Sequence, residues 1–197
     1  MSARPALPIL LASTSPQRRA ILEQLGLPFD VVSPRYEEHD PPDADPVELV
    51  RAHAQGKARS VAAGADGRPV LGVDTTVVLD GRVYTKPADA TDAELMLEAL
   101  SGRTHTVVSG LCLLTSGWEV AETEATHVTF RQLTPRETAA YVAGGEWEAR
   151  AGAYAIQGRG AALVERIDGD YLNVVGLPAA LLVKLLAERF PGTYGFG

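Results

Sequence analysis

The sequence has few sulfur-containing or aromatic residues and no long apolar run. Its 197 residues include one cysteine and two methionines, and 6% are aromatic. Cys112 cannot form an intramolecular disulfide, and its apolar surroundings (110–114) predict a buried thiol rather than a nucleophile. No apolar run approaches the roughly 20 residues of a membrane span, and the start lacks the apolar core of a secretion signal. We therefore expect a soluble cytoplasmic protein with no membrane partner.

Positive charge is also scarce. Lysine and arginine number 18 against 25 aspartates and glutamates, which gives a net charge of −7 and a pI of about 5.1. Because nonspecific nucleic-acid binders need a basic surface, we do not expect a nucleic-acid polymer as partner. A small anionic substrate stays compatible, since local cations or a metal can outweigh the overall charge. The hydrophobic content of 46% suffices for one sizeable core or two small lobes.

Apolar periodicity and turn signals predict a mixed α/β fold with a largely antiparallel, twisted sheet flanked by helices. Strands are expected at 7–12, 29–32, 70–79, 82–84, 104–115, 119–130, 162–167 and 171–174. Helices are expected at 16–25, 46–63, 91–100, 135–142 and 178–189. Asp80-Gly81 predicts a two-residue hairpin, and Thr91 with Glu94 and Thr134 with Glu137 predict capping boxes. No Rossmann glycine fingerprint is present.

The first strand leads through Ser13-Thr14-Ser15-Pro16 into a helix that carries Arg18 and Arg19 in its first turn. A helix start directs backbone N–H groups and positive dipole charge to one place, which suits a phosphate. Ser15 can cap this helix, and proline fits its first position. Arginines usually favour the other helix end, so an anion is expected here. A capped surface helix with solvated arginines is an equally good interpretation of this segment alone.

Several acidic residues could hold a divalent metal. Asp74 lies inside an otherwise apolar strand, where a carboxylate needs a partner or a cation unless it faces solvent. Glu37 and Glu38 follow the second strand, in a loop that could reach an adjacent site. Such oxygen ligands suit Mg²⁺ or Mn²⁺ shared with substrate phosphates. The histidines, including His53, have no zinc spacing and are expected to be structural or exposed.

The remaining candidates are cations and one glycine-rich segment. Lys57 lies on a predicted helix four residues after His53, on the same face, and Lys86 stands at an irregular boundary before Pro87. Each lysine alone fits a solvated surface. Together with Arg18 they supply the cations that a metal-bound triphosphate requires. Gln157, within 151–160, offers a donor and an acceptor to a base edge, although such a loop can simply turn the chain.

Eight short motifs occur in a fixed order along the chain: 11–19, Glu37-Glu38, 55–58, 72–75, Lys86-Pro87, 100–105, 151–158 and 175–178. In this combination they resemble the Maf family of nucleoside triphosphate pyrophosphatases, from about residue 7 to residue 190. The resemblance implies a house-cleaning enzyme that cuts between the α- and β-phosphates with a divalent metal, Mg²⁺ or Mn²⁺, to give a nucleoside monophosphate and pyrophosphate. It also implies an elongated fold similar to the inosine triphosphatase type, often dimeric. We expect a single domain of this kind over residues 1–197. A division of this domain into two lobes, with the active site in the cleft between them, is compatible with the resemblance.

The resemblance also assigns residue roles. It makes Asp74 the general base and Glu38 its partner in holding the metal. The phosphates would be bound by four further residues, Ser13, Arg18, Lys57 and Lys86, and the base would be read in part by Gln157.

One position departs from the family pattern. The uridine and thymidine triphosphate branch carries Arg, Thr and Gln at the three positions that this chain fills with Gln17, Thr75 and Gln157. The 7-methyl-GTP branch carries Trp, Gln and Glu. Gln17 matches neither, and its neutral amide lacks the charge and planar fork of arginine. We therefore expect pyrimidine triphosphates as substrates, with relaxed selectivity.

Two other functions fit the same residues. One is a purine-directed pyrophosphatase, of the inosine triphosphatase or 7-methyl-GTP type. The other is a nucleotide-binding regulator of septum formation with little catalysis. A pure binder has no need of a water-activating carboxylate beside phosphate-binding cations, so Glu38 and Asp74 favour an enzyme. A protein in which these charges are unrelated surface groups is disfavoured by the order of the motifs.

Overall fold

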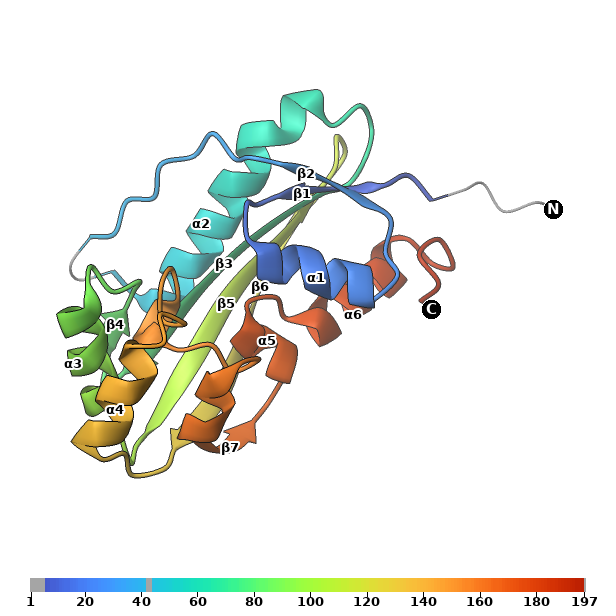
Figure 1. The fold of residues 1–197 in the computed structure, drawn as a ribbon. Coiled ribbons are helices and arrows are strands. Elements are labelled where there is room, and N and C mark those ends of the chain that lie inside the picture. Colours follow the sequence, from blue (N-terminus) through green and yellow to red (C-terminus); the bar gives the residue numbers. More distant parts are fainter. Residues whose placement is uncertain (1–5, 42–43, 197) are drawn as a thin grey trace. The chain divides into compact units, whose positions relative to one another are not determined.

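The structure is a computed structural model that describes residues 6–41 and 44–196, and it contains a mixed sheet with helices packed on it (Figure 1). The strands are β1 (Ile9–Ala12), β2 (Phe29–Val32), β3 (Val70–Leu79), β4 (Arg82–Tyr84), β5 (Thr104–Leu114), β6 (Glu119–Phe130) and β7 (Val164–Asp168). The α-helices are α1 (Pro16–Gln24), α2 (Pro46–Val61), α3 (Ala90–Leu100), α4 (Pro135–Val142), α5 (Tyr171–Val175) and α6 (Ala179–Arg189). Short 3-10 helices are η1 (Ala62–Gly64), η2 (Ala151–Ala153) and η3 (Arg159–Leu163). The strands pair in the order β2-β1-β3-β5-β6-β7, with β4 on β3.

The chain divides into two compact units, and the first comprises Met1–Asp74, Ser109–Glu124 and Gly176–Gly197. In this unit β1 pairs in parallel with both β2 and β3, because α1 and α2 supply the crossover connections that parallel strands need. All four residues of β1 are buried, as its unbroken apolar run predicts for a strand covered on both faces. The predicted mixed α/β sheet is thus confirmed, with its parallel pairings gathered around β1.

Helix α2 packs unusually closely on β3 and β5 within this first unit. A Cβ atom added to Gly72 would lie 2.1 Å from the carbonyl oxygen of Ala54, and one added to Gly110 would lie 2.2 Å from that of Val50. Such distances admit only glycine, because the opposing atoms belong to the helix backbone. Ala54 and Ala58 are fully buried in the cluster that forms below the helix. The two strand glycines therefore fix the height of α2 above the sheet.

The second unit comprises Thr75–Val108 and Ala125–Val175 and has its own core. Phe130 and Tyr154 lie at its centre, with ring centroids 4.9 Å apart in an edge-to-face arrangement. The predicted hairpin between β3 and β4 is present, and both turn residues have positive φ (Asp80 51°, Gly81 76°), as its turn type requires. The capping box of Thr134 and Glu137 is also confirmed at α4.

Two local predictions were wrong. Residues 171–174 form the start of α5 rather than a strand, because the Asp170 carboxylate accepts a hydrogen bond from the backbone N–H of Leu172 and starts the helix. Helix α3 is capped by Asp89, whose side chain accepts from the N–H of Asp92, and not by Thr91. Cys112 is buried as predicted, and burial raises the pKa of its thiol to about 12.

Candidate active site

The loop after β1 and the first turn of α1 are held by serine hydroxyls. The buried Ser13 Oγ accepts from the backbone N–H of Ser15 at 3.1 Å and from Arg18 Nη1 at 3.3 Å. Ser15 caps α1 by accepting from the N–H of Arg18, as the sequence predicts. Arg18 also donates through Nε to the carbonyl oxygen of Gly176 at 2.8 Å. Its guanidinium is therefore oriented by the fold, and burial lowers its pKa without removing its charge.

Asp74 lies on β3 beneath α2, with 15% of its side chain exposed. Two α2 side chains one helical turn apart reach it on different oxygens. Lys57 Nζ lies 2.5 Å from Oδ1, and His53 Nδ1 lies 3.4 Å from Oδ2. Both α2 residues are buried, because the glycine-mediated packing places this face of the helix on the sheet. The carboxylate in the apolar strand is thus paired, as the energetics of buried charge require.

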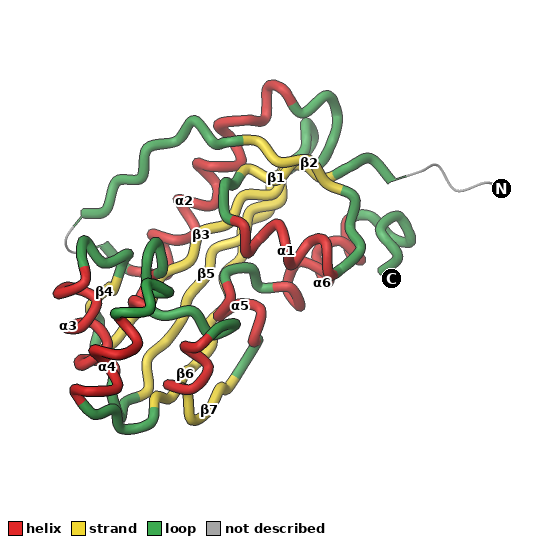
Figure 2. The backbone as a smooth tube through the Cα atoms, viewed as in Figure 1, coloured by secondary structure: helices red, strands yellow, loops and turns green. Residues whose placement is uncertain are grey.

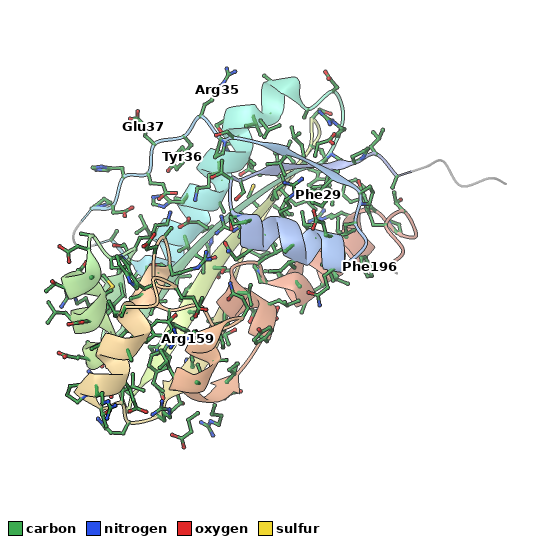
Figure 3. The ribbon with its side chains drawn as sticks, in the orientation of Figure 1. Phe29, Arg35, Tyr36, Glu37, Arg159 and Phe196 are labelled. Atoms are coloured by element: carbon green, nitrogen blue, oxygen red, sulfur yellow. The ribbon has the colours of Figure 1, made fainter. Side chains whose placement is uncertain are left out.

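Glu38 approaches the same lysine from the loop between β2 and α2. Its Oε1 lies 2.6 Å from Lys57 Nζ, and 47% of its side chain is exposed. The stretch 33–41 is loop throughout and runs beside α2 (Figure 2). Glu37 is exposed and points away from the helix (Figure 3). Of the acidic pair in the sequence, only Glu38 therefore contacts the cluster.

This loop is attached to α2 at several points. Tyr36 points toward the helix (Figure 3), and its ring packs where a Cβ on Gly56 would lie only 2.2 Å from it. The N–H of Arg35 donates to Ser60 Oγ at 3.1 Å, and the Tyr36 ring also meets the His53 ring edge-on at 5.8 Å. The absence of a side chain at Gly56 thus leaves room for the Tyr36 ring, which attaches the loop that carries Glu38 to α2.

The charges of the cluster keep Asp74 ionised. Burial alone would raise the pKa of this carboxyl. The hydrogen bond with His53 and the positive charges of Lys57 and Arg18 outweigh burial and lower the pKa to about 2. The same hydrogen bond to Asp74 raises the pKa of His53, against the effect of burial. A buried carboxylate that stays charged at neutral pH is suited to binding a cation or orienting water.

The donor set fits a divalent metal. One ligand atom from each of Glu38, His53 and Asp74 can be chosen so that all lie within 4.8 Å of one another. Two carboxylates and an imidazole are ligands that Mn²⁺ and related ions accept, and carboxylates suit Mg²⁺. The sequence prediction of Glu38 and Asp74 as neighbours is therefore supported by the geometry, together with a histidine that the sequence did not assign to the site.

Gln17 lies in the first unit, and three further predicted residues belong to the second. Gln17 Oε1 accepts from Ser15 Oγ at 3.1 Å. Thr75 follows Asp74 on β3 and is partly buried, and Lys86 is exposed after β4. Gln157 is exposed in the turn between η2 and η3.

The turn that carries Gln157 has a fixed backbone. The Tyr141 hydroxyl accepts from the N–H of Ala155, and the Glu146 carboxylate accepts from those of Arg159 and Gly160. A Cβ on Gly158 would lie 2.2 Å from Glu146 Oε1, so that glycine permits a close approach. The backbone of the glycine-rich segment is therefore held by the buried Tyr141 and the partly exposed Glu146, and it carries the exposed Gln157.

The chain matches known proteins over almost its whole length. The family described as Maf-like protein matches residues 8–189. A protein named dTTP/UTP pyrophosphatase from Gloeobacter violaceus is 51% identical, over 91% of this chain and 95% of that protein. One of the same name from Deinococcus radiodurans is 43% identical over 100% of both chains. The solved structure of the Staphylococcus aureus Ham1 protein aligns with a TM-score of 0.45 and 14% identity, over 63% of this chain and 72% of that one.

None of the helices in the described part of the chain has the length and apolar content to cross a membrane. The match over residues 8–189 and the high identity to several relatives agree with the ordered motifs found in the sequence. This chain belongs to the Maf-like protein family.

Proposed function

We propose that this protein is a nucleoside triphosphate pyrophosphatase, which adds water across the α–β phosphoanhydride of pyrimidine nucleoside triphosphates. The products would be a nucleoside monophosphate and pyrophosphate. The observation that carries the proposal is the buried, ionised Asp74 in contact with Lys57 and His53. The names of its relatives, dTTP/UTP pyrophosphatase, supply the substrate class.

The phosphate chain would bind to the cations of the first unit. Arg18 already has its guanidinium oriented by Ser13 and by the carbonyl of Gly176. Oriented cations reduce the repulsion between a polyanion and an attacking nucleophile without reorganising during the reaction. Lys57 would contribute a second positive charge. On the motif resemblance, the proposal extends to Lys86 as a third phosphate-binding cation.

Asp74 would act as the general base that accepts a proton from the attacking water. The neighbouring positive charges and the hydrogen bond with His53 keep Asp74 ionised, but the low pKa that they cause also makes the carboxylate a weak base. Substrate phosphates would compete with Asp74 for the charge of Lys57 and Arg18, and each cation that a phosphate neutralises would relieve the depression of the Asp74 pKa. Substrate binding would therefore increase the basicity of the carboxylate when it is needed.

Glu38 and Asp74 would hold a divalent cation, Mg²⁺ or Mn²⁺. Such an ion supplies Lewis-acid neutralisation of the phosphate oxygens. Glu38 would serve this role from an exposed position on its loop, where a carboxylate oxygen can reach a metal shared with substrate.

Base selection would involve Gln17, Thr75 and Gln157. The amides of the two glutamines can donate and accept, which matches the mixed edge of uracil or thymine. Because Gln17 lacks the fork of an arginine, we propose weaker discrimination between pyrimidines than an arginine would give. Replacing Gln157 by Ala should raise KM for UTP more than it lowers kcat. The resemblance extends the proposal to a cytoplasmic homodimer, which light scattering and cell fractionation would test.

The decisive experiment measures pyrophosphate release with Mg²⁺ or Mn²⁺ across UTP, dTTP, CTP, GTP, ITP and 7-methyl-GTP. Asp74→Asn should keep the fold and lose at least about a hundredfold in turnover, which is the usual scale of general-base catalysis. Asp66→Asn is the matched control, because this exposed turn residue has a φ of 50° that asparagine tolerates.

Each outcome has a definite meaning. Turnover of UTP and dTTP that disappears in Asp74→Asn but not in Asp66→Asn supports the proposal. A strong preference for 7-methyl-GTP or ITP contradicts the pyrimidine assignment. Tight nucleotide binding without pyrophosphate release from any substrate would favour the regulator.

A further inference from the structure

His53 is the buried group in the cluster that the proposed reaction does not use. Its side chain is 4% exposed and lies on α2 one turn before Lys57. A buried imidazole needs a partner for each ring nitrogen. The two ring nitrogens have different partners, and these partners show which nitrogen is available to a metal.

The outer nitrogen, Nε2, faces two groups that only accept hydrogen bonds. It lies 3.3 Å from Asp40 Oδ1 and 3.4 Å from the carbonyl oxygen of His39. Nε2 must therefore carry a hydrogen. In a neutral ring the other nitrogen, Nδ1, then presents its lone pair.

That lone pair is directed at a negative group. Nδ1 lies 3.4 Å from Asp74 Oδ2, so the two atoms can share either a proton, as in the hydrogen bond described above, or a metal cation that takes the place of that proton. Lys57 does not fill this role, because its ammonium contacts the other oxygen, Oδ1. The Oδ2 side of the carboxylate, together with Nδ1, thus forms a place for a separate cation.

We propose that His53 Nδ1 is the third protein ligand of the divalent cation, alongside Glu38 and Asp74. The inference rests on the metal dependence of the proposed function. It is supported by the closeness of the three residues, since one possible ligand atom from each lies within 4.8 Å of the others. It is also supported by the surroundings of Nε2, since metal-binding histidines typically donate their other N–H to a carboxylate or a backbone carbonyl, and here both are present.

A nitrogen ligand changes which metal the site prefers. Mg²⁺ favours an all-oxygen shell, whereas imidazole suits Mn²⁺ and the later divalent ions better. We therefore expect this protein to bind Mn²⁺ more tightly than Mg²⁺, and to owe much of that preference to His53.

The test uses Mn²⁺ as probe and the full chain stripped of metal with EDTA. Mn²⁺ affinity is measured from the EPR signal of the free ion, Mg²⁺ affinity by competition, and nitrogen ligation by pulsed EPR of bound Mn²⁺. His53→Asn is the informative variant, because its amide N–H can still donate to Asp74 but offers no nitrogen lone pair. His39→Gln is the control. It removes the neighbouring imidazole of His39 but keeps the backbone carbonyl of that residue, which is the group that contacts His53.

The expected result is a ¹⁴N coupling in the native protein and in His39→Gln that is absent in His53→Asn. The variant should also lose about tenfold or more in Mn²⁺ affinity and less in Mg²⁺ affinity. Bound Mn²⁺ without nitrogen coupling in the native protein overturns the inference, whether or not the variant folds. Unchanged Mn²⁺ affinity in a folded His53→Asn overturns it as well.

Pyrophosphate release distinguishes this failure from failure of the proposed function. Release that persists while nitrogen coupling is absent leaves the enzyme assignment standing and refutes only the role of His53. Nitrogen coupling without release from any nucleotide supports the metal ligand and refutes the proposed reaction.

Discussion

Lowering the pH from 7 to 5 should destabilise the second unit through a single buried histidine. His105 is 1% exposed, and its ring packs edge-on against Phe130 and Tyr154. Nε2 lies 2.9 Å from the Tyr154 hydroxyl, and Nδ1 has no hydrogen-bonding partner in the described part of the chain. A charged ring would therefore bury an N–H without an acceptor. Burial lowers the pKa of His105 from 6.5 to about 4.

The magnitude follows from linkage between protonation and folding. The unfolded chain binds a proton at this residue with a pKa of about 6.5, and the folded chain does so only near 4. The contribution of the neutral ring is complete above the unfolded pKa and is lost as the pH falls toward the folded one. Between pH 7 and pH 5 the loss in unfolding free energy is about 2 kcal/mol.

Urea unfolding at the two pH values measures this loss, with Trp147 as the reporter because it packs on the core of the second unit. The other tryptophan, Trp118, belongs to the first unit and is replaced by Phe. His105→Gln in that background removes the titrating ring and keeps a polar group for Tyr154. We expect the unfolding free energy of Trp118→Phe to fall by about 2 kcal/mol more between pH 7 and pH 5 than that of the double variant with His105→Gln. A parallel loss in both proteins would refute the burial argument.

Two glycine substitutions should separate stability from activity. Gly72→Ala forces a Cβ toward the backbone carbonyl of Ala54, so it should lower the unfolding free energy by about 1–3 kcal/mol in urea titrations. An unchanged urea midpoint would show that α2 can move away from β3 without a loss of stability. In Gly56→Ala the atoms nearest to the new Cβ belong to the Tyr36 ring, and alanine gains about 1 kcal/mol of helix propensity over glycine, so stability should change little. Because Tyr36 seats the loop of Glu38, Gly56→Ala should still reduce pyrophosphate release severalfold, and full activity would contradict that role.

The parts of the fold that depend on local chemistry could be predicted from the sequence. Ser15 with Pro16, the box of Thr134 with Glu137, and the Asp80-Gly81 turn each act within a few residues, and each is present. The segment 171–174 could not be predicted in this way. It is short and apolar, and what decides its conformation is Asp170, whose N–H is bound by the distant Thr126 hydroxyl.

The candidate site could be predicted in its members better than in its contacts. The order of the motifs indicated Arg18, Glu38, Lys57 and Asp74, which the first unit brings together. His53 was not assigned, although its spacing of four from Lys57 is visible in the sequence. Spacing shows that two residues share a helix face but not what that face meets. The facing partner depends on how α2 lies over β3, which is a property of the packing.

The packing of α2 on β3 explains why glycines lie within this helix and on the strand below it, although no turn at these positions requires a glycine. Gly72 allows the backbone of α2 to come down onto β3, so that side chains one turn apart, His53 and Lys57, reach the two oxygens of a single strand carboxylate. Gly56 removes a side chain from the helix itself and admits the Tyr36 ring, which places Glu38 against Lys57. A glycine inside a helix costs about 1 kcal/mol relative to alanine. In a protein whose net stability is on the order of 10 kcal/mol, such a cost is tolerable where it positions a reactive carboxylate and its cations.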